Sequence, residues 1–280
     1  MMKRSFRAGL AAGVAALMAG AAVPASAKEL LQQSYGSDPR HRLDLFVPAG
    51  IKSGERRKVV LYFHGGGWQH GNTYRHRFVG RALAAKGYVA AVSTYRLYPQ
   101  VKFPAFMHDA AKAVAWMRAN VARRGGDPGR IYLMGHSAGA HIAALLALDP
   151  RYLKVAGVPR RALAGVIGLA GPYVFNPKGW HTFAPVFEAH PNPSARPVDF
   201  VRSFRTLGGP PLLLLQGATD RLVRPHEGPG LARAYRAVGG KAKVKTYPAL
   251  GHVGVLLAIA QPLRWRAPVL KDVIAWIGRP

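Results

Sequence analysis

The sequence predicts an α/β fold, with a mostly parallel central sheet flanked by helices and a small cap segment outside it. Apolar runs of strand length alternate with helical patterns through most of the chain, an order typical of βαβ units. The chain has 280 residues, 49% of them hydrophobic, which suffices for one sizeable core. We therefore expect one domain over residues 28–280.

The first 27 residues have the features of a secretory signal peptide. A basic segment over residues 3–7 precedes an apolar stretch of mostly small residues over 8–23, and residues 25–27 form a cleavage site of the A-x-A type. A retained membrane anchor is the alternative, but the stretch is short and weakly hydrophobic for a spanning helix. We expect cleavage after Ala27, export to the periplasm or the exterior, and no integral membrane segment in the mature chain.

Strands and helices alternate in the next segment. Residues 43–47 alternate as a short strand, and a Pro-Ala-Gly turn follows them. The apolar run 59–63 predicts a buried strand that ends at a run of glycines. Residues 78–85 have helical spacing and stop near a glycine, and residues 88–92 predict the next strand.

The middle of the chain continues this order. Pro104 opens a long amphipathic helix that runs through residue 120, because proline is favoured in the first turn of a helix. A loop is expected over residues 123–128. Residues 131–134 predict a strand, and residues 138–148 predict the helix after it.

The last third of the chain completes the sheet. Residues 163–169, 211–215 and 243–247 are apolar or alternating runs that predict three more strands, and residues 269–277 predict a final helix. Prolines and aromatics dominate residues 171–205, where the alternation breaks. An interior linker would not contain so many aromatics, so we expect a small cap over the ends of the strands.

Composition excludes several classes of function. The formal net charge is +28, but the basic residues are scattered and form no periodic basic helix or nucleic-acid motif. We therefore expect a well-solvated basic surface and no nucleic-acid partner, although attraction to an anionic polymer is the alternative. The absence of cysteine excludes disulfides, a thiol nucleophile and thiolate metal ligands. No pair of histidines has convincing metal-ligand spacing, so no metal is expected.

The pentapeptide Gly135–Gly139 has the pattern G-x-S-x-G between a predicted strand and a predicted helix. In that context the pattern indicates a nucleophile elbow, in which a tight turn lifts the hydroxyl of Ser137 off the sheet. The two glycines leave room for the turn. The backbone N–H of Ala138 would lie at a helix N-terminus, where partial positive charge collects.

A serine hydroxyl needs a base to accept its proton. His252 follows the last predicted strand and has glycines nearby on both sides, so its ring can turn inward. Asp220 follows the preceding strand and would hold the imidazole in the right tautomer. Glu227 is the fallback for that carboxylate. His64 is expected to brace the glycine turn by a hydrogen bond.

The glycine run after residues 59–63 has three candidate roles. A phosphate loop would need a lysine where Asn72 stands, and a dinucleotide loop would need a glycine where His70 stands. An oxyanion hole needs only backbone N–H groups that point towards the serine, and H-G-G-G is a pattern for that role. We therefore expect Gly66, Gly67 and Ala138 to donate to an oxyanion.

Three aromatic residues are candidate substrate contacts, namely Trp68, Tyr173 and Trp180. Trp68 closes the glycine run, and it either walls the acyl pocket or anchors the loop in the core. The other two belong to the expected cap.

The chain resembles the α/β-hydrolase superfamily, and within it the carboxylesterases with an HGGG loop. It is most similar to the branch of bacterial feruloyl and acetyl esterases and kynurenine formamidase-like enzymes. The resemblance covers roughly residues 40–278. The matching segments are 64–68 with Gly71, 95–97, 103–104 with Asp109, 126–128, 135–141, 216–220 and 251–252. Ser93-Thr94 departs from the proline and aspartate of many relatives.

This resemblance implies an α/β-hydrolase fold with a Ser137, Asp220 and His252 triad and an acyl-enzyme intermediate, without a cofactor. It implies that Asp109 is structural. We therefore expect an exported serine esterase acting on a small-molecule or polysaccharide-linked carboxylic ester. Three alternatives stay open, namely an arylformamidase or amidase-type hydrolase, a feruloyl or acetyl-xylan esterase, and a non-catalytic binding module on the same fold.

Overall fold

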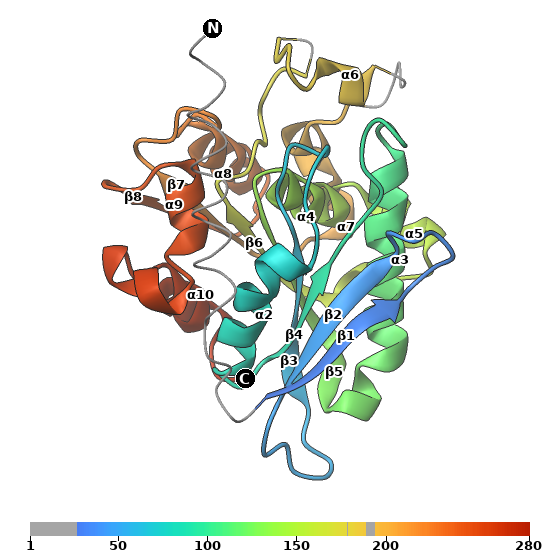
Figure 1. Ribbon diagram of the computed structural model, residues 1–280. Coiled ribbons are helices and arrows are strands. Elements are labelled where there is room, and N and C mark those ends of the chain that lie inside the picture. The colour runs from blue at the N-terminus through green and yellow to red at the C-terminus, as the bar shows by residue number, and fades with distance from the viewer. Residues whose placement is uncertain (1–26, 178, 189–193) are drawn as a thin grey trace, which may run out of the picture.

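The computed structural model describes residues 27–280, except 178 and 189–193 (Figure 1). The predicted leader therefore lies outside the described residues, apart from Ala27. The strands are β1 (Ala27–Ser34), β2 (Arg42–Pro48), β3 (Arg57–Phe63), β4 (Val89–Ser93), β5 (Gly126–His136), β6 (Leu163–Leu169), β7 (Leu212–Gly217) and β8 (Ala242–Tyr247).

The helices connect and cover these strands. The α-helices are α2 (Arg77–Ala84), α3 (Ala105–Asn120), α4 (Ala138–Leu148), α5 (Pro150–Val155), α6 (Ala184–Phe187), α7 (Phe204–Leu207), α8 (Glu227–Ala237), α9 (His252–Leu257) and α10 (Val269–Ile277). Short 3₁₀ helices are η1 (Tyr74–His76), η2 (Ala122–Arg124), η3 (Arg160–Ala162), η4 (Pro197–Ser203) and η5 (Gln261–Arg266).

All eight strands form one sheet in the order β1-β2-β4-β3-β5-β6-β7-β8. β1 pairs with β2 and β2 with β4 in antiparallel fashion, and every other neighbouring pair is parallel. The predicted fold class, a mostly parallel sheet flanked by helices, is therefore confirmed. Because parallel strands end at the same edge, the loops after β3, β5, β7 and β8 gather at one end of the sheet.

Each face of the sheet has its own hydrophobic core. Val59, Leu61 and Phe63 of β3 pack in the core that α3, α4 and α8 cover. Val60 and Tyr62 of the same strand pack in the core that α2, α9 and α10 cover. This alternation follows from the two-residue period of a strand, and it holds both helix layers against the sheet (Figure 1).

The prediction of a loop over residues 123–128 is wrong, because a helix and a strand occupy the two ends of that range. Residues 122–124 form η2, and β5 begins at Gly126, which pairs with Arg57 of β3. A Cβ at Gly126 would lie 2.3 Å from Cγ2 of Val121, so this strand end fits only because the residue is glycine. The glycine and proline that suggested a loop thus lie within a strand.

The segment over residues 171–205 lies beside the glycine run and α4, and Figure 1 shows α6 above α4. Within its described part, the carbonyl oxygen of Thr182 accepts a hydrogen bond from Nε2 of Gln69 at 3.2 Å. The carbonyl oxygen of Ala195 accepts one from Nε2 of His141 at 2.6 Å. The excursion predicted from the aromatic composition is thus tied to the body of the protein by several hydrogen bonds, these two among them.

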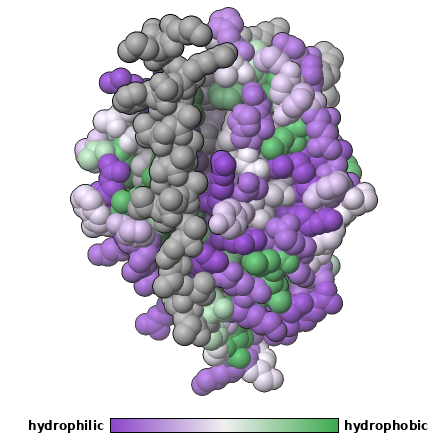
Figure 2. All heavy atoms as spheres, in the orientation of Figure 1, coloured by the Kyte–Doolittle hydropathy of each residue, from purple (hydrophilic) through white to green (hydrophobic). Residues whose placement is uncertain are grey.

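The surface shown in Figure 2 is mostly hydrophilic outside the grey atoms, with small separate hydrophobic patches. Among the described residues, no helix has the length and hydrophobicity that crossing a membrane requires.

Candidate active site

Ser137 lies on a sharp turn between the end of β5 and the start of α4. Its backbone has φ 54° and ψ −120°, a region that non-glycine residues rarely adopt. A Cβ at Gly135 would lie 2.2 Å from the carbonyl carbon of Gly139, and a Cβ at Gly139 would lie 2.0 Å from the carbonyl oxygen of Phe63. The turn therefore needs both glycines, as the sequence pattern predicted.

The three residues of the predicted triad lie within hydrogen-bonding distance of one another. Nε2 of His252 is 2.9 Å from Oγ of Ser137, and Nδ1 of His252 is 2.8 Å from Oδ2 of Asp220. The imidazole donates from Nδ1 to the carboxylate, which leaves Nε2 free to accept from the serine hydroxyl. Three separate loops thus bring a serine hydroxyl, an imidazole and a carboxylate into one chain of hydrogen bonds.

The carboxylate of Asp220 is held by main-chain and side-chain donors. The amides of Leu222 and Val223 each donate to Oδ1 at 2.9 Å, and Nε2 of Gln216 donates to Oδ2 at 3.2 Å. Burial alone would raise the pKa of Asp220, but the hydrogen bond and charge of His252 and these amides keep the pKa below its ordinary value. The group therefore stays ionised beside the imidazole.

His136 is a site residue that the sequence analysis did not assign. Its Nε2 donates to the backbone carbonyl oxygen of His252 at 3.0 Å. Burial lowers the pKa of His136 to about 3, with the neighbouring His252 contributing in the same direction. The only sequence signal was a histidine at the free position of G-x-S-x-G, and nothing in the pattern states what that side chain contacts.

The glycine run lies directly against the nucleophile turn. A Cβ at Gly65 would lie 3.3 Å from Cβ of Ser137. Gly66 and Gly67 have φ of 125° and 61°, and the carbonyl oxygen of Gly66 accepts hydrogen bonds from the amides of Gln69 and His70. Ala138 is the first residue of α4, so its N–H has no partner within the helix. The predicted oxyanion donors thus come from two segments that meet at Ser137.

His64 braces this loop in the way that the sequence predicted. Its Nδ1 donates to the carbonyl oxygen of Gly65 at 2.8 Å, and its ring stacks on Tyr95 with centroids 4.6 Å apart. The hydroxyl of Tyr95 donates to the carbonyl oxygen of His64 at 2.9 Å. Burial lowers the pKa of His64 to about 4, so the ring stays neutral.

The three aromatic candidates for substrate contact lie in different surroundings. Trp68 is 1% exposed, and its ring packs among those of Phe187, His141 and Phe183 at 4.9, 5.1 and 5.8 Å between centroids. Trp68 therefore anchors the loop in the core and lines no open pocket. Tyr173 is also 1% exposed, packed against Gly168 of β6 and Gly171 just after it, so the structure does not place it at a pocket surface. Trp180, by contrast, lines a cavity.

Glu227, the fallback for the triad carboxylate, serves elsewhere. Its Oε2 accepts hydrogen bonds from the amides of Tyr173 and Val174, each at 2.6 Å. The fallback is therefore wrong, because Asp220 alone occupies the position beside His252. Glu227 instead fixes the start of the cap segment to the first residue of α8.

Asp109 joins α3 to the loop after β4. Its carboxylate accepts hydrogen bonds from the backbone N, Nε and Nη2 of Arg96 at 3.0, 2.9 and 2.7 Å. Burial would raise the pKa of Asp109, but these bonds and the nearby His41 keep the pKa below its ordinary value. This is the structural role that the resemblance implied.

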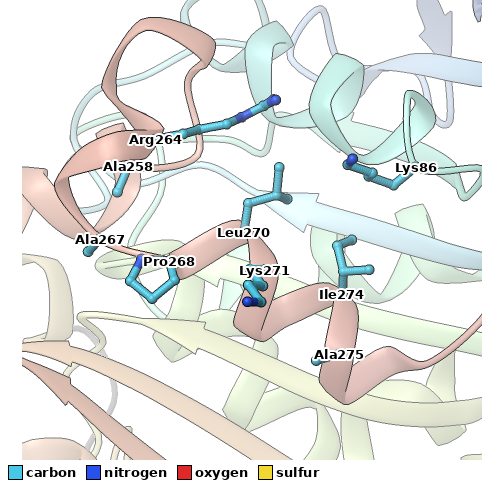
Figure 3. A pocket seen from close by; sticks show the side chains of 9 residues that line it. All are labelled: Lys86, Ala258, Arg264, Ala267, Pro268, Leu270, Lys271, Ile274 and Ala275. Atoms are coloured by element: carbon cyan, nitrogen blue, oxygen red, sulfur yellow. The ribbon is translucent and has the colours of Figure 1, made fainter.

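Cavities lie in different parts of the described chain. One lies between the cap segment and the loop after Asp220 and is described below. Another is lined by Lys86, Arg264, Leu270, Lys271, Ile274 and their neighbours, and Figure 3 shows Lys86 facing α10 across it. None of its lining residues belongs to the triad or the glycine run. Within the described part of the chain, no cluster of side chains is suited to hold a metal ion.

Two family models match the chain. The BD-FAE model matches residues 43–158, and the prolyl oligopeptidase family model matches residues 107–279. An isoprenylcysteine alpha-carbonyl methylesterase of Arabidopsis thaliana is 31% identical over 86% of the chain and 60% of its own length. The esterase LipC of Mycobacterium tuberculosis is 29% identical over 86% of the chain and 67% of its own length. The chain thus spans about 60% of the length of the methylesterase relatives.

A solved structure has the same fold. An inhibited esterase B from Lactobacillus rhamnosis superposes with a TM-score of 0.80 at 23% identity, over 98% of this chain and 94% of that one. The resemblance to α/β-hydrolase carboxylesterases that the motifs suggested is therefore confirmed. Because the longer family match covers more than half of the chain, the protein belongs to the prolyl oligopeptidase family of the α/β-hydrolase superfamily.

Proposed function

We propose that this protein is an exported serine carboxylesterase that hydrolyses its substrate through an acyl-enzyme. One observation carries the proposal, namely the continuous pair of hydrogen bonds from Ser137 through His252 to Asp220, at 2.9 and 2.8 Å. The names of the relatives support an ester as the bond that is cleaved.

The steps of the reaction follow from this geometry. Nε2 of His252 accepts the proton of the Ser137 hydroxyl as Oγ attacks the ester carbonyl carbon. Asp220 stabilises the imidazolium and stays ionised. The imidazolium then gives its proton to the leaving alkoxide, which departs as an alcohol and leaves the acyl group on Oγ. Water, deprotonated by the same imidazole, releases the acid and restores the serine.

The negative charge of each tetrahedral intermediate needs fixed donors. We assign this role to the N–H groups of Gly66, Gly67 and Ala138. The glycine run approaches Ser137 at Gly65, Ala138 follows the serine directly, and main-chain donors require no reorganisation during the reaction. Loss of one such donor typically costs about 2.7–4 kcal/mol of transition-state stabilisation. No residue of this scheme requires a cofactor.

The proposal is tested with p-nitrophenyl butyrate and a fluorophosphonate probe. The purified protein should release p-nitrophenol, and mass spectrometry should locate the probe on Ser137. Ser137→Ala should abolish both, while Ser203→Ala, on η4, should retain them. Turnover unchanged in Ser137→Ala, or probe attached elsewhere, would refute the triad.

The nature of the bond and the ester requires a panel of substrates. Methyl ferulate and acetylated xylan represent the feruloyl and acetyl-xylan alternatives, N-formylkynurenine represents the arylformamidase alternative, and a prolyl peptide represents a peptidase. We expect hydrolysis of esters to exceed that of the amides. No turnover on any member, together with no labelling by the probe, would favour a non-catalytic binding module.

Export is part of the proposal and rests on the sequence of residues 1–27. The mature protein would then be one catalytic domain over residues 28–280 with a cap over 171–205. Fractionation of cells that express the full chain should place it outside the cytoplasm, with Lys28 as its first residue. A full-length cytoplasmic product would contradict the export proposal and leave the esterase proposal intact.

A further inference from the structure

A cavity of about 410 Å³ lies between the start of the cap segment and the loop that follows Asp220. Phe175 and Trp180 form an aromatic wall on the cap side. Arg221, Leu222 and Arg224 line the opposite side, next to His226 and Glu227 at the start of α8. An aromatic wall facing two guanidinium groups suits a planar or extended anion better than a neutral chain.

This cavity adjoins the triad through shared backbone. Leu222 and Val223 line it with their side chains, and their amides hold the Asp220 carboxylate. On the other side, the ring of Trp180 lies 4.7 Å from that of Phe183, between centroids. A Cβ at Gly67 would lie 2.3 Å from that Phe183 ring. Contacts of the lining residues thus connect the cavity to the predicted oxyanion loop on one side and to the carboxylate of Asp220 on the other.

The walls of the cavity are held in place. Glu227 fixes the cap side through two short hydrogen bonds to the amides of Tyr173 and Val174. Both bonds go to Oε2, and the carboxylate is buried, so its lone pairs are engaged within the protein. Nε2 of His226 lies 3.9 Å from its Oε1.

Arg221 and Arg224 are left without acidic partners. Both side chains are exposed, and within the described residues neither forms an ion pair or a hydrogen bond. Other arginines that lie close to a carboxylate form ion pairs with it, such as Arg96 with Asp109. Two unpaired guanidinium groups on one wall of a cavity leave room for a carboxylate from outside the chain.

We propose that this cavity binds a carboxylate carried by the ester substrate, with Arg221 and Arg224 as its ligands. This inference rests on the proposed function and names its substrate class, an ester with a second, ionised carboxyl group. The carboxylate would accept hydrogen bonds from one or both guanidinium groups, while Trp180 contacts the adjacent apolar part of the molecule.

Two matched pairs of substrates test the inference and distinguish the two sides of the ester. Mono-p-nitrophenyl glutarate against p-nitrophenyl butyrate puts the carboxylate on the acyl side. 4-Acetoxybenzoate against 4-acetoxybenzamide puts it on the alcohol side. The ratio of kcat/KM for the charged over the neutral member should exceed one in at least one pair and should fall as salt rises.

The variant Arg221→Ala/Arg224→Ala should lower that ratio roughly tenfold, as expected for loss of a hydrogen bond to a charged group. The control Lys271→Ala removes a charge from the cavity of Figure 3 and should leave the ratio unchanged. The inference is overturned if neither pair shows a preference that depends on the arginines, or if Lys271→Ala lowers the ratio equally, because general attraction to a basic protein would then explain it.

Binding without turnover separates this inference from the proposed function. In a Ser137→Ala background, calorimetry should show tighter binding of 4-acetoxybenzoate or glutarate than of their amides, and the double arginine variant should remove that difference. Preferential binding by a protein that hydrolyses no ester would uphold the cavity and refute the esterase. Hydrolysis of neutral esters without any preference for a carboxylate, in rate or in binding, would uphold the esterase and refute the proposed role of the cavity.

Discussion

His136 donates a hydrogen bond from Nε2 to the backbone carbonyl oxygen of His252, with the two rings 4.8 Å apart between centroids. The turn that presents the nucleophile thus also holds the main chain of the base, while Asp220 holds its ring. Since burial keeps His136 neutral, it retains the Nε2 proton that this bond requires. The residue positions His252 and does not itself reach the reacting atoms in this arrangement.

Replacing His136 with phenylalanine should lower kcat up to about tenfold with little change in KM, because a neutral hydrogen bond of this kind is worth about 0.5–1.5 kcal/mol. Steady-state kinetics on p-nitrophenyl butyrate measure both constants. His108→Phe, on α3 beside Tyr152, is the matched control and should leave kcat unchanged. Equal losses in the two variants would indicate general destabilisation and not positioning.

Asp220→Asn should lower kcat by a factor on the order of 10⁴, because an amide cannot hold the imidazole in the required tautomer or stabilise its charge. Asp127→Asn is the matched control, since Asp127 pairs with Arg130 at the surface and lies at the start of β5, the opposite end of that strand from the Ser137 turn. Thermal unfolding of both variants checks that the fold is retained. A loss of less than tenfold in Asp220→Asn would mean that this carboxylate does not orient the base.

Gly67→Ala should lower kcat about 10²–10³-fold, because a Cβ there would lie 2.3 Å from Cε1 of Phe183 and would displace a predicted oxyanion donor. Gly157→Ala tests the backbone cost alone. Gly157 has φ 68° against 61° for Gly67, and nothing lies within 4 Å of its added Cβ. Both variants should lose stability, but only Gly67→Ala should lose activity. Equal activity in the two would remove Gly67 from the oxyanion hole.

Trp68→Ala should lower the free energy of unfolding by about 3–5 kcal/mol, the usual cost of deleting a large buried aromatic. Trp265→Ala is its control, because that side chain is 82% exposed and its loss should change stability by no more than about 0.5 kcal/mol. Urea unfolding followed by circular dichroism measures both. A small effect at Trp68 would contradict its role as anchor of the glycine loop.

Stability should fall as the pH falls from about 6.5 towards 4. Burial lowers the pKa values of His64, His136 and His141 to about 4, 3 and 4, against 6.5 for exposed histidine. In this window the unfolded chain binds protons that the folded chain does not, so protonation favours unfolding. Each group contributes up to about 1.4 kcal/mol per pH unit.

Urea unfolding at pH 7.5 and pH 5 measures this dependence. The carboxylates with lowered pKa, Asp109 and Asp220, lose their contribution only as the pH falls below about 4, so they do not affect the comparison. His141→Gln should reduce the difference between the two pH values. Equal stability at both would show that these histidines are protonated in the folded protein.

Strong local patterns in the sequence predicted the parallel part of the fold. The helix over 138–148 and the strand over 163–169 agree with α4 and β6 at both ends. β1 was not predicted, because its residues are mostly polar and half-exposed at the edge of the sheet. α8 was not predicted either, since its first turn contains two glycines and a proline, residues that usually interrupt a helix.

In the candidate site, too, some residues could be predicted from the sequence and others could not. Ser137, Asp220 and His252 stand at points where backbone geometry demands particular residues, so the sequence pattern indicated each of them. The contacts of His136 and Glu227 are between side chains and distant main chain, and no spacing in the sequence reports them. Trp68 and Tyr173 were ambiguous for a related reason, because an aromatic residue beside a site packs inward or outward depending on its neighbours in space.

The close approach of Gly139 to the carbonyl oxygen of Phe63 has a different consequence for the rate of the proposed reaction than for the choice of substrate. The strand that leads into the proposed oxyanion loop and the helix that follows Ser137 meet main chain to main chain at this point. In the proposed esterase, substitutions elsewhere should therefore change the reaction with the carbonyl little. The side chains of the cap and of the Asp220 loop should instead determine which ester binds. Substituting those side chains should change which esters the protein hydrolyses and leave kcat on a small ester nearly unchanged.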